Sequence, residues 1–248
     1  MVQMTIAADI IKMTKKKKLH FSLLDPDKQK PEVAGSIAMT ATEAGSSAIM
    51  VGGSTLISQK QVDDTVKAIK KNTGLPVILF PSGSKFLSKY ADAVFFMSLL
   101  NSRNPDYLIR EHVKGAKFVK QSGLEPISMG YVIVEPGMTA GRIGEADLLK
   151  KSDIETAVGY ALAAQYLGMS FFYLEAGSGA PFPVSNEMIK AVKENADIPL
   201  IIGGGIRSVE TAREKARAGA DIIITGTTLE KEKNLGRALS DIIKAIEE

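Results

Sequence analysis

The stretch Leu200-Ile201-Ile202-Gly203-Gly204-Gly205-Ile206-Arg207-Ser208 is a short β-branched run that ends abruptly at glycine. About one strand–helix unit further along, the pattern returns as Ile222-Ile223-Ile224-Thr225-Gly226-Thr227-Thr228. Glycine lets backbone N–H groups approach a ligand without an intervening Cβ atom, and such a turn leading towards a helix favours a bound phosphate. In (β/α)8 barrels this pair of turns follows strands 7 and 8. The two stretches therefore predict a barrel enzyme that binds a phosphorylated small molecule.

The length and composition of the chain fit one such barrel. Its 248 residues are close to the ~250 typical of the fold, and 45% of them are hydrophobic, enough for a large core. A net charge of only +3 argues against nucleic acid as a partner. The absence of cysteine excludes disulfides and thiolate metal sites. Since neither a signal-peptide pattern nor an apolar run of membrane-spanning length is present, we expect a cytoplasmic protein.

Strand-like and helix-like segments alternate from end to end. The predicted strands are His20–Leu24, Ala48–Val51, Val77–Phe80, Ala93–Met97, Pro126–Val134, Phe171–Glu175, Leu200–Ile202 and Ile222–Thr225. The predicted helices are Pro31–Ala44, Ile57–Lys71, Tyr107–Gln121, Ile154–Leu167, Asn186–Asn195, Val209–Ala218 and Gly236–Ile246, with Ile6–Met13 as an extra helix that closes the bottom of the barrel. We predict an α/β fold, a single-domain (β/α)8 TIM barrel over residues 1–248, with a doubly wound open sheet as the alternative.

Two connections depart from the regular repeat. Pro81–Asp92, after the third predicted strand, is too short for a normal helix with two loops, so we expect an atypical short connection there. Glu135–Ser152, after the fifth, is long and contains three glycines. Long loops on the upper face of a barrel usually serve ligands, which makes this segment a candidate part of the site.

Carboxylates follow the first predicted strand, in Leu24-Asp25-Pro26-Asp27-Lys28. Barrel active sites are built at this end of the strands, and oxygen ligands suit Mg²⁺, which often uses one or two carboxylates together with substrate phosphates. The alternative is a turn in which an aspartate caps the next helix. The second strand ends in Val51-Gly52-Gly53-Ser54-Thr55, where Ser54 is either a ligand to phosphate or metal, or a helix N-cap.

The sixth predicted strand runs Phe171-Phe172-Tyr173-Leu174-Glu175 and continues into Ala176-Gly177-Ser178-Gly179. Because side chains alternate along a strand, Tyr173 and Glu175 share one face. If that face is the lumen, a carboxylate held among apolar neighbours can have a raised pKa and accept a proton. Glu175 is therefore either a general base or a member of a buried ion pair.

Other features carry weaker predictions. His112 lies in a helical pattern and is expected at the surface, and His20 begins the first strand, away from the catalytic end. Ser82-Gly83-Ser84 is a candidate diphosphate contact.

The run Lys15-Lys16-Lys17-Lys18 is interpreted as the solvated end of a helix, with contact to an anionic membrane surface as the alternative. The apolar upper ends of strands 4 and 5 either pack the barrel or line a channel for a hydrocarbon chain: Phe95, Phe96, Met97, Leu99, Leu100 and Tyr131.

Taken in order, five motifs resemble those of the geranylgeranylglyceryl phosphate synthase family over almost the whole chain. They are Asp25-Pro26-Asp27, Gly52-Gly53-Ser54, Tyr173-Leu174-Glu175-Ala176-Gly177-Ser178-Gly179, Gly203-Gly204-Gly205-Ile206-Arg207 and Gly226-Thr227. The resemblance implies a barrel prenyltransferase that joins geranylgeranyl diphosphate to the C3 hydroxyl of sn-glycerol 1-phosphate, which forms the first ether bond of archaeal membrane lipids. It also implies a homo-oligomer, a dimer or a hexamer, and transient contact with a membrane surface.

The resemblance further implies roles for individual residues. Asp25 and Ser54 would bind Mg²⁺. For the mechanism, our own hypothesis is that Glu175 accepts the hydroxyl proton, with Tyr173 as the second catalytic residue. The glycerol phosphate would be held by Tyr173, Leu174, Glu175, Ala176, Gly177, Ser178, Gly179, Gly204, Gly205, Gly226 and Thr227. Bacterial relatives that use longer, heptaprenyl donors have a lysine where this chain has Leu23, and a shorter sixth-strand motif. The archaeal reaction is therefore favoured, with the bacterial one, a sugar-phosphate isomerase or aldolase, and a non-catalytic sensor as alternatives.

Overall fold

The computed structural model describes residues 5–53, 58–226 and 234–248. The strands are β1 Leu19–Leu24, β2 Ala48–Gly52, β3 Val77–Phe80, β4 Ala93–Leu99, β5 Glu125–Ile133, β6 Phe171–Glu175, β7 Leu200–Gly203 and β8 Ile222–Thr225. The helices are α1 Ile6–Thr14, α2 Pro31–Ala44, α3 Gln59–Asn72, α4 Glu111–Ser122, α5 Met138–Ile143, α6 Ile154–Tyr166, α7 Asn186–Asn195, α8 Val209–Ala218 and α9 Leu235–Glu247. Two short segments complete the order, a 3₁₀ turn η1 at Ser84–Phe86 and a π-helical turn η2 at Asp106–Arg110.

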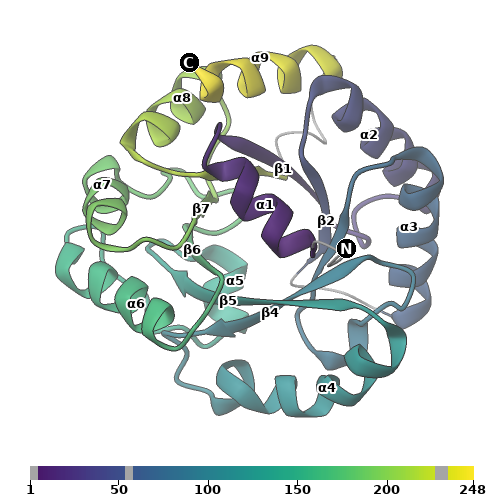
Figure 1. The fold of residues 1–248 in the computed structure, drawn as a ribbon, viewed down its shortest axis with the longest axis horizontal. Helices are drawn as coiled ribbons and strands as arrows, with labels where there is room; N and C mark the ends of the chain where they lie inside the picture. Colours follow the sequence, from purple (N-terminus) through teal and green to yellow (C-terminus); the bar gives the residue numbers. More distant parts are fainter. Residues whose placement is uncertain (1–4, 54–57, 227–233) are drawn as a thin grey trace.

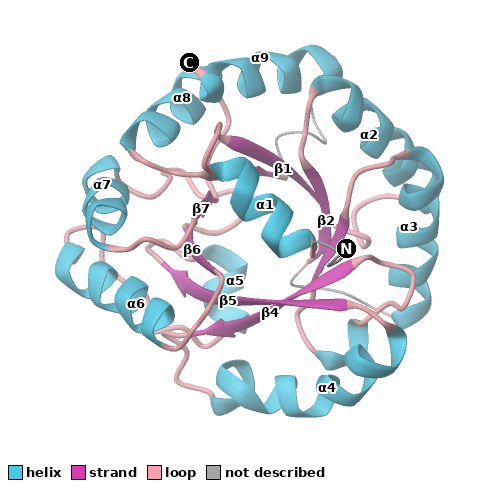
Figure 2. Cartoon of the chain, viewed as in Figure 1, coloured by secondary structure: helices cyan, strands magenta, loops and turns pink. Residues whose placement is uncertain are grey.

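The strands pair in parallel and in chain order, and β8 pairs back with β1, so that the sheet closes into a barrel. Figure 1 shows the helices as an outer ring around it, and Figure 2 separates the inner strands from that ring by colour. This is the predicted (β/α)8 fold. The doubly wound alternative is wrong because an open sheet ends in two edge strands, whereas here every strand pairs with a neighbour on each side.

Alternate side chains along each strand divide the core into an inner and an outer part. Leu19 and Phe21 of β1 point into the barrel, where they pack with Tyr173 of β6 and Ile224 of β8. The intervening side chains, such as Leu24, face the surrounding helices. Strands covered on both faces need apolar residues on both, which explains why their sequences are nearly continuous runs of Val, Ile, Leu and Phe.

The lower end of the barrel is closed by α1, which crosses it in Figure 1. Ile10 inserts into the inner cluster, and the Glu125 carboxylate at the start of β5 accepts hydrogen bonds from the backbone N–H groups of Ile6 and Ala7 at 2.7 and 2.8 Å. A carboxylate at a helix N-terminus satisfies unpaired N–H groups and opposes the positive end of the helix dipole. The predicted closing helix is therefore present and fastened to the sheet.

Both irregular connections are present where the sequence predicts them. Between β3 and β4 the chain forms only η1, so the repeat lacks a full helix there. The long segment after β5 contains α5, a short helix that was not predicted. Ser102 and Asn101, which follow β4, hold this segment: Ser102 Oγ donates to the Gly144 carbonyl at 2.6 Å, and Asn101 Nδ2 donates to the Asp147 carbonyl at 2.8 Å.

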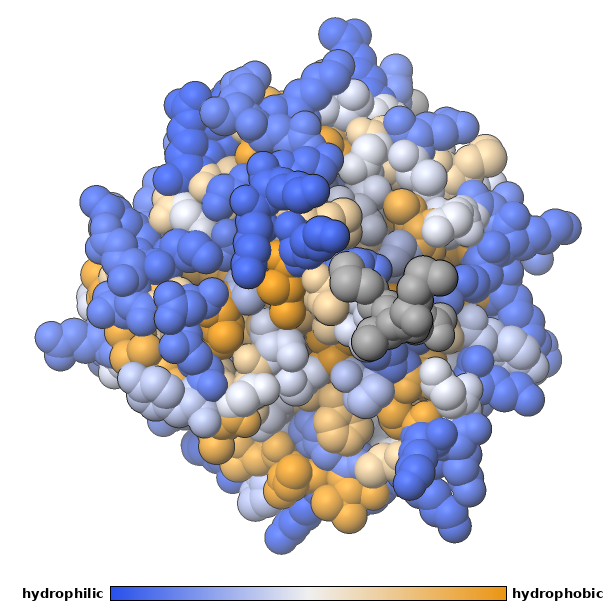
Figure 3. Space-filling view, in the orientation of Figure 1, coloured by the Kyte–Doolittle hydropathy of each residue, from blue (hydrophilic) through white to orange (hydrophobic). Residues whose placement is uncertain are grey.

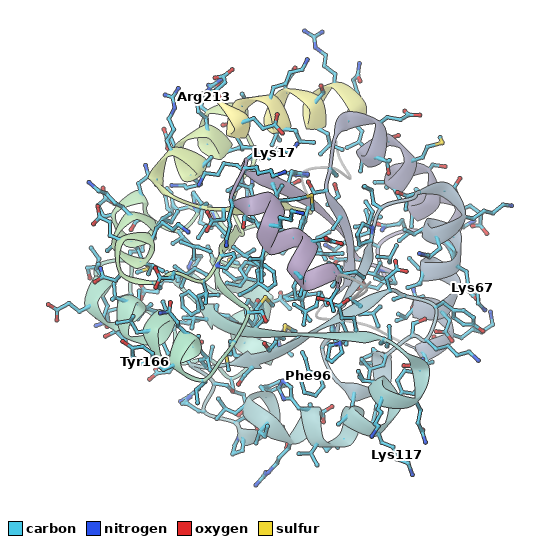
Figure 4. The ribbon with its side chains drawn as sticks, viewed as in Figure 1. Lys17, Lys67, Phe96, Lys117, Tyr166 and Arg213 are labelled. Carbon is cyan, nitrogen blue, oxygen red and sulfur yellow. The ribbon has the colours of Figure 1, made fainter. Side chains whose placement is uncertain are left out.

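On the face that carries α1, hydrophilic residues cover the rim and the upper part in Figure 3, while apolar residues gather at the lower left and bottom. The lysine run follows α1 on this face, and two of its members form ion pairs, Lys17 with Glu247 of α9 at 2.7 Å and Lys18 with Asp221 at 3.5 Å. Lys17 lies beside α9 in Figure 4. Across the described residues, none of the helices has both the length and the apolar character that crossing a bilayer requires.

Candidate active site

Tyr173 and Glu175 lie at the upper end of β6 and point into the barrel, as their alternation predicts. The Tyr173 hydroxyl donates a hydrogen bond to Glu175 Oε2, and the Gly177 N–H donates to Oε1 at 2.7 Å. At Gly203 on the neighbouring strand, a Cβ atom would collide with the Tyr173 hydroxyl. Glycine is required there for the tyrosine–glutamate pair to fit inside the barrel.

The environment of Glu175 suits it to accept a proton. Only 7% of the residue is exposed, and this burial raises the pKa of its carboxyl group. The hydrogen bonds from Tyr173 and Gly177 lower the pKa, and the negative charge of Asp25 raises it again, with a net upward shift. A carboxylate with a raised pKa is a stronger base, while its two donors keep it aimed at one place.

The glycine turn after β7 packs directly against this carboxylate. Gly204 has a φ of 80°, and a Cβ atom there would collide with Glu175 Oε1 and lie 2.6 Å from the Gly177 nitrogen. Arg207 in the same turn reaches back to the turn after β6, where its guanidinium donates to the carbonyl of Ala180 at 2.9 Å. The turns after β6 and β7 are therefore joined by Arg207 and together form one wall of the site, called the glycine wall below. The sequence did not predict this role of Arg207, because nothing in the motif shows which way the side chain points.

A cavity of about 630 Å³ opens above this wall. Most of the predicted site residues within the described ranges line it: Asp25, Tyr173, Glu175, Ser178, Gly179, Gly204, Gly205 and Gly226. Leu174 and Ala176 point instead into the outer apolar cluster, so any contact they make with a ligand comes from their backbone. Ser54 and Thr227 lie outside the described residues.

Asp25 follows β1 and lines the same cavity. An oxygen of its carboxylate and one of Asp27 each lie 3.3 Å from the position that a Cβ atom on Gly53 would occupy, so the two acidic groups converge on one point. Burial raises the pKa of Asp25, and its ion pair with Lys28 lowers it. Among the described residues no group of three or more His, Cys, Asp or Glu side chains could hold a metal alone. A pair of converging carboxylates nevertheless fits Mg²⁺, which commonly completes its shell with water and substrate phosphate.

The other half of the cavity is apolar. The rings of Phe80, Tyr131 and Tyr173 pack against one another at the top of the barrel, with centroid distances between 5.1 and 5.9 Å. From there the cavity passes outwards under α4, where Gly115 and Leu87 line it. This arrangement favours the channel interpretation for the ends of strands 4 and 5, although Leu100 packs into the outer cluster instead.

The predicted surface position of His112 is wrong. The side chain is half-buried, lines the cavity, and packs edge-on against Phe96 with a ring-centroid distance of 4.6 Å. Figure 4 places Phe96 between β4 and α4. A helical pattern indicates which face of a helix is apolar. A histidine at the border of that face can be buried or exposed, so the pattern does not show that His112 lines the cavity.

Comparison with known proteins agrees with this architecture. The model of the PcrB family matches residues 11–247. Geranylgeranylglyceryl phosphate synthase of Pyrococcus horikoshii is 54% identical over 223 residues, covering 90% of this chain and 88% of that protein. The protein of the same name from Picrophilus torridus is 49% identical over 243 residues, covering 98% of this chain and 100% of that protein.

A solved structure extends the likeness to three dimensions. It is the crystal structure of (S)-3-O-geranylgeranylglyceryl phosphate synthase from Thermoplasma acidophilum in complex with its substrate sn-glycerol-1-phosphate. It is 45% identical in sequence, covers 99% of each chain and superposes with a TM-score of 0.96. The family model and these relatives span nearly the whole chain, and the chain therefore belongs to the PcrB family.

Proposed function

We propose that this protein transfers the geranylgeranyl group of geranylgeranyl diphosphate to the C3 hydroxyl of sn-glycerol 1-phosphate. In this reaction the bond between the allylic carbon and the diphosphate breaks, an ether bond forms to the glycerol oxygen, and the hydroxyl proton leaves. The observation that carries the proposal is one cavity with two unlike halves. A glycine-lined wall next to a buried carboxylate faces a channel of aromatic and aliphatic side chains.

The polar half suits the glycerol phosphate. Gly179, Gly204, Gly205 and Gly226 bring main chain to the cavity surface from three neighbouring strands. Such backbone can donate several N–H groups to one phosphate, and α8 begins shortly after the second of these turns. The phosphate of the relative's substrate, sn-glycerol-1-phosphate, is a ligand of this chemistry.

Glu175 is placed to accept the proton of the attacking hydroxyl. It lies beside the glycine wall, so a glycerol held there by its phosphate presents its free hydroxyl end to the carboxylate. Holding both reactants in one geometry can contribute several kcal/mol to the acceleration, and a positioned general base contributes roughly 10²–10⁴-fold. The apolar half excludes water from the allylic carbon, which as a developing cation would otherwise react with it.

We infer that Asp25 and Asp27 face the diphosphate of the donor and that Asp25 holds Mg²⁺ there. When bound, Mg²⁺ neutralises the charge that develops on the departing diphosphate. Lys28, which pairs with Asp25, already supplies one positive charge at this edge.

Replacement of Asp25 by Asn should raise the Mg²⁺ concentration needed for half-maximal activity by about tenfold or more, because a neutral amide is a weaker ligand. A Mg²⁺ titration of initial rates measures this. Asp64→Asn, on the exposed face of α3, is the matched control, and Asp27→Asn tests whether the second carboxylate takes part. An unchanged Mg²⁺ requirement in Asp25→Asn would contradict the assignment.

The experiment that tests the function is a release assay with purified protein, Mg²⁺, sn-glycerol 1-phosphate and geranylgeranyl diphosphate. We expect diphosphate release that depends on both substrates, together with an ether lipid product in the organic phase. Heptaprenyl diphosphate as donor tests the bacterial-type reaction, which Leu23 in place of a lysine disfavours. Turnover of a sugar phosphate without a prenyl donor would instead support the isomerase or aldolase alternative, and ligand binding without turnover would support the sensor.

We further propose that the protein is cytoplasmic, forms homo-oligomers and contacts membranes transiently to exchange its lipid donor and product. The lysine run lies at the amino ends of the strands, whereas the cavity opens at their carboxyl ends. A bilayer that delivers the donor would therefore meet the opposite face, and the solvated interpretation of Lys15–Lys18 is favoured.

A further inference from the structure

Four buried polar side chains form a network on the outer side of β1 and β8, and Thr225, the last of the four, also borders the cavity. Ser22 Oγ lies 3.0 Å from Ser46 Oγ, which lies 2.9 Å from His20 Nδ1. The other ring nitrogen of His20, Nε2, lies 2.8 Å from Thr225 Oγ1. None of the four residues is more than 5% exposed.

The network lies in a layer whose buried side chains are mostly apolar. Outward-facing residues of the strands, such as Ile223 and Leu24, pack against helices. Burying hydroxyls and an imidazole in such a layer is costly unless they are hydrogen-bonded, whereas apolar side chains would fill the space without that requirement. Directional bonds in a low dielectric do, however, fix positions more narrowly than apolar contacts.

The end of β8 has fewer backbone hydrogen bonds to hold its position than the rest of the strand. The ladder between β7 and β8 ends at the pair Ile202–Ile223, while the ladder between β1 and β8 continues to the pair Ser22–Thr225. The last two residues of β8 are therefore paired to only one neighbouring strand. Thr225 receives a second anchor through its side chain, because His20 reaches it diagonally from β1.

Gly226, the next residue, lines the cavity beside the turn that contains Gly204 and Gly205, because β7 and β8 are neighbouring strands. We propose that the Ser22–Ser46–His20–Thr225 network positions the end of β8 and thereby sets the gap between these turns that receives the phosphate. This inference rests on the proposed function. His20 and Thr225 are positioning residues: the Thr225 hydroxyl is bound to His20 rather than aimed at a ligand, and the pair fixes the main chain that leads into Gly226.

The decisive comparison is Thr225→Val against Thr225→Ser. Valine has the same shape but no hydroxyl, whereas serine keeps the hydroxyl. In steady-state assays we expect Thr225→Val to raise KM for sn-glycerol 1-phosphate by roughly five- to tenfold, the cost of one lost hydrogen bond, with kcat and KM for geranylgeranyl diphosphate little changed. Thr225→Ser should restore the wild-type KM. Ile223→Val, on the same face of the same strand, controls for general loosening of this layer.

A second pair tests the network from its other end and decides the matter if Thr225→Val does not fold. The amide nitrogen of Gln can take the place of His Nε2, and that of Asn the place of Nδ1. His20→Gln should therefore retain the contact with Thr225 and a near-normal KM for sn-glycerol 1-phosphate. His20→Asn should lose the contact and show a raised KM.

Two outcomes would overturn the inference. In one, Thr225→Val and His20→Asn lower the melting temperature but leave the KM for glycerol phosphate at the wild-type value. In the other, Ile223→Val raises that KM as much as they do. Failure of the proposed function is distinguishable, since wild-type protein would then show no saturable dependence on sn-glycerol 1-phosphate at all.

Discussion

Glu175 carries the largest prediction at the scale of single residues. Glu175→Gln keeps one oxygen to accept from the Gly177 N–H, and its amide nitrogen can donate to the Tyr173 hydroxyl, so the site should remain folded, but the amide cannot accept a proton. Turnover should fall by roughly 10²–10⁴, while the KM for sn-glycerol 1-phosphate changes little. Steady-state kinetics with a thermal melt as control measure both. Unchanged turnover would show that the carboxylate is structural, as in the buried ion-pair interpretation.

Tyr173 adjusts the same carboxylate. Its hydrogen bond lowers the pKa of Glu175, against the raising effect of burial. Tyr173→Phe should therefore move that pKa further up, and because a general base must be deprotonated, activity should be lost at a higher pH than in the wild type as the solution is acidified. The acid limb of a kcat–pH profile measures the shift. An acid limb that stays in place would mean that the tyrosine only fills space beside Gly203.

The roles of these residues differ in how far sequence can predict them. The inward direction of Tyr173 and Glu175 follows from the alternation of side chains along a strand. The glycine-rich turns can be identified directly in the sequence. The bond from Arg207 to the turn after β6 and the diagonal reach of His20 to Thr225 join residues far apart in sequence. No periodicity encodes such contacts, because they depend on the closure of the barrel.

At the scale of elements, α4 sets the outer end of the apolar channel. A Cβ atom on Gly115 would lie 3.1 Å from Leu87 Cδ1 and 3.5 Å from Ser84 Cβ, so α4 and η1 are in close contact there. Gly115→Leu should fill this end and lower kcat/KM for geranylgeranyl diphosphate by at least about tenfold, while the shorter farnesyl diphosphate is affected less. Competition between the two donors measures the change. Equal losses for both would indicate that α4 has simply been displaced.

The elements themselves were largely predictable because their signals are local. The strands agree to within two residues at each end, and α2, α7 and α8 have the predicted bounds. Ser185 and Ser208 cap α7 and α8, each accepting from an N–H three residues further along the chain. In contrast, α5 has six residues, too few to show a helical period, and is held by Asn101 and Ser102 from another connection. Its helix depends on tertiary contacts that sequence periodicity does not report.

At the scale of the whole molecule, the buried network makes stability depend on pH. Burial lowers the pKa of His20 from 6.5 to about 3. Between these two values the unfolded chain binds a proton that the folded chain does not, so the stability contributed by neutral His20 is complete above pH 6.5 and is lost as the pH falls towards 3. One such proton corresponds to a slope of about 1.4 kcal/mol per pH unit.

The free energy of unfolding should therefore decline more steeply with acidification in the wild type than in His20→Gln, which cannot take up the proton. Urea denaturation at a series of pH values between about 7 and 4 measures both slopes. Burial also lowers the pKa of His112, but that residue is common to both proteins, so its effect cancels in the difference. The contrast should be clearest above the range in which carboxylates titrate, about pH 4.5. Parallel curves would mean that His20 takes up its proton in the folded state as readily as in the unfolded chain, and the network would then be open to water rather than sealed between β1 and β8.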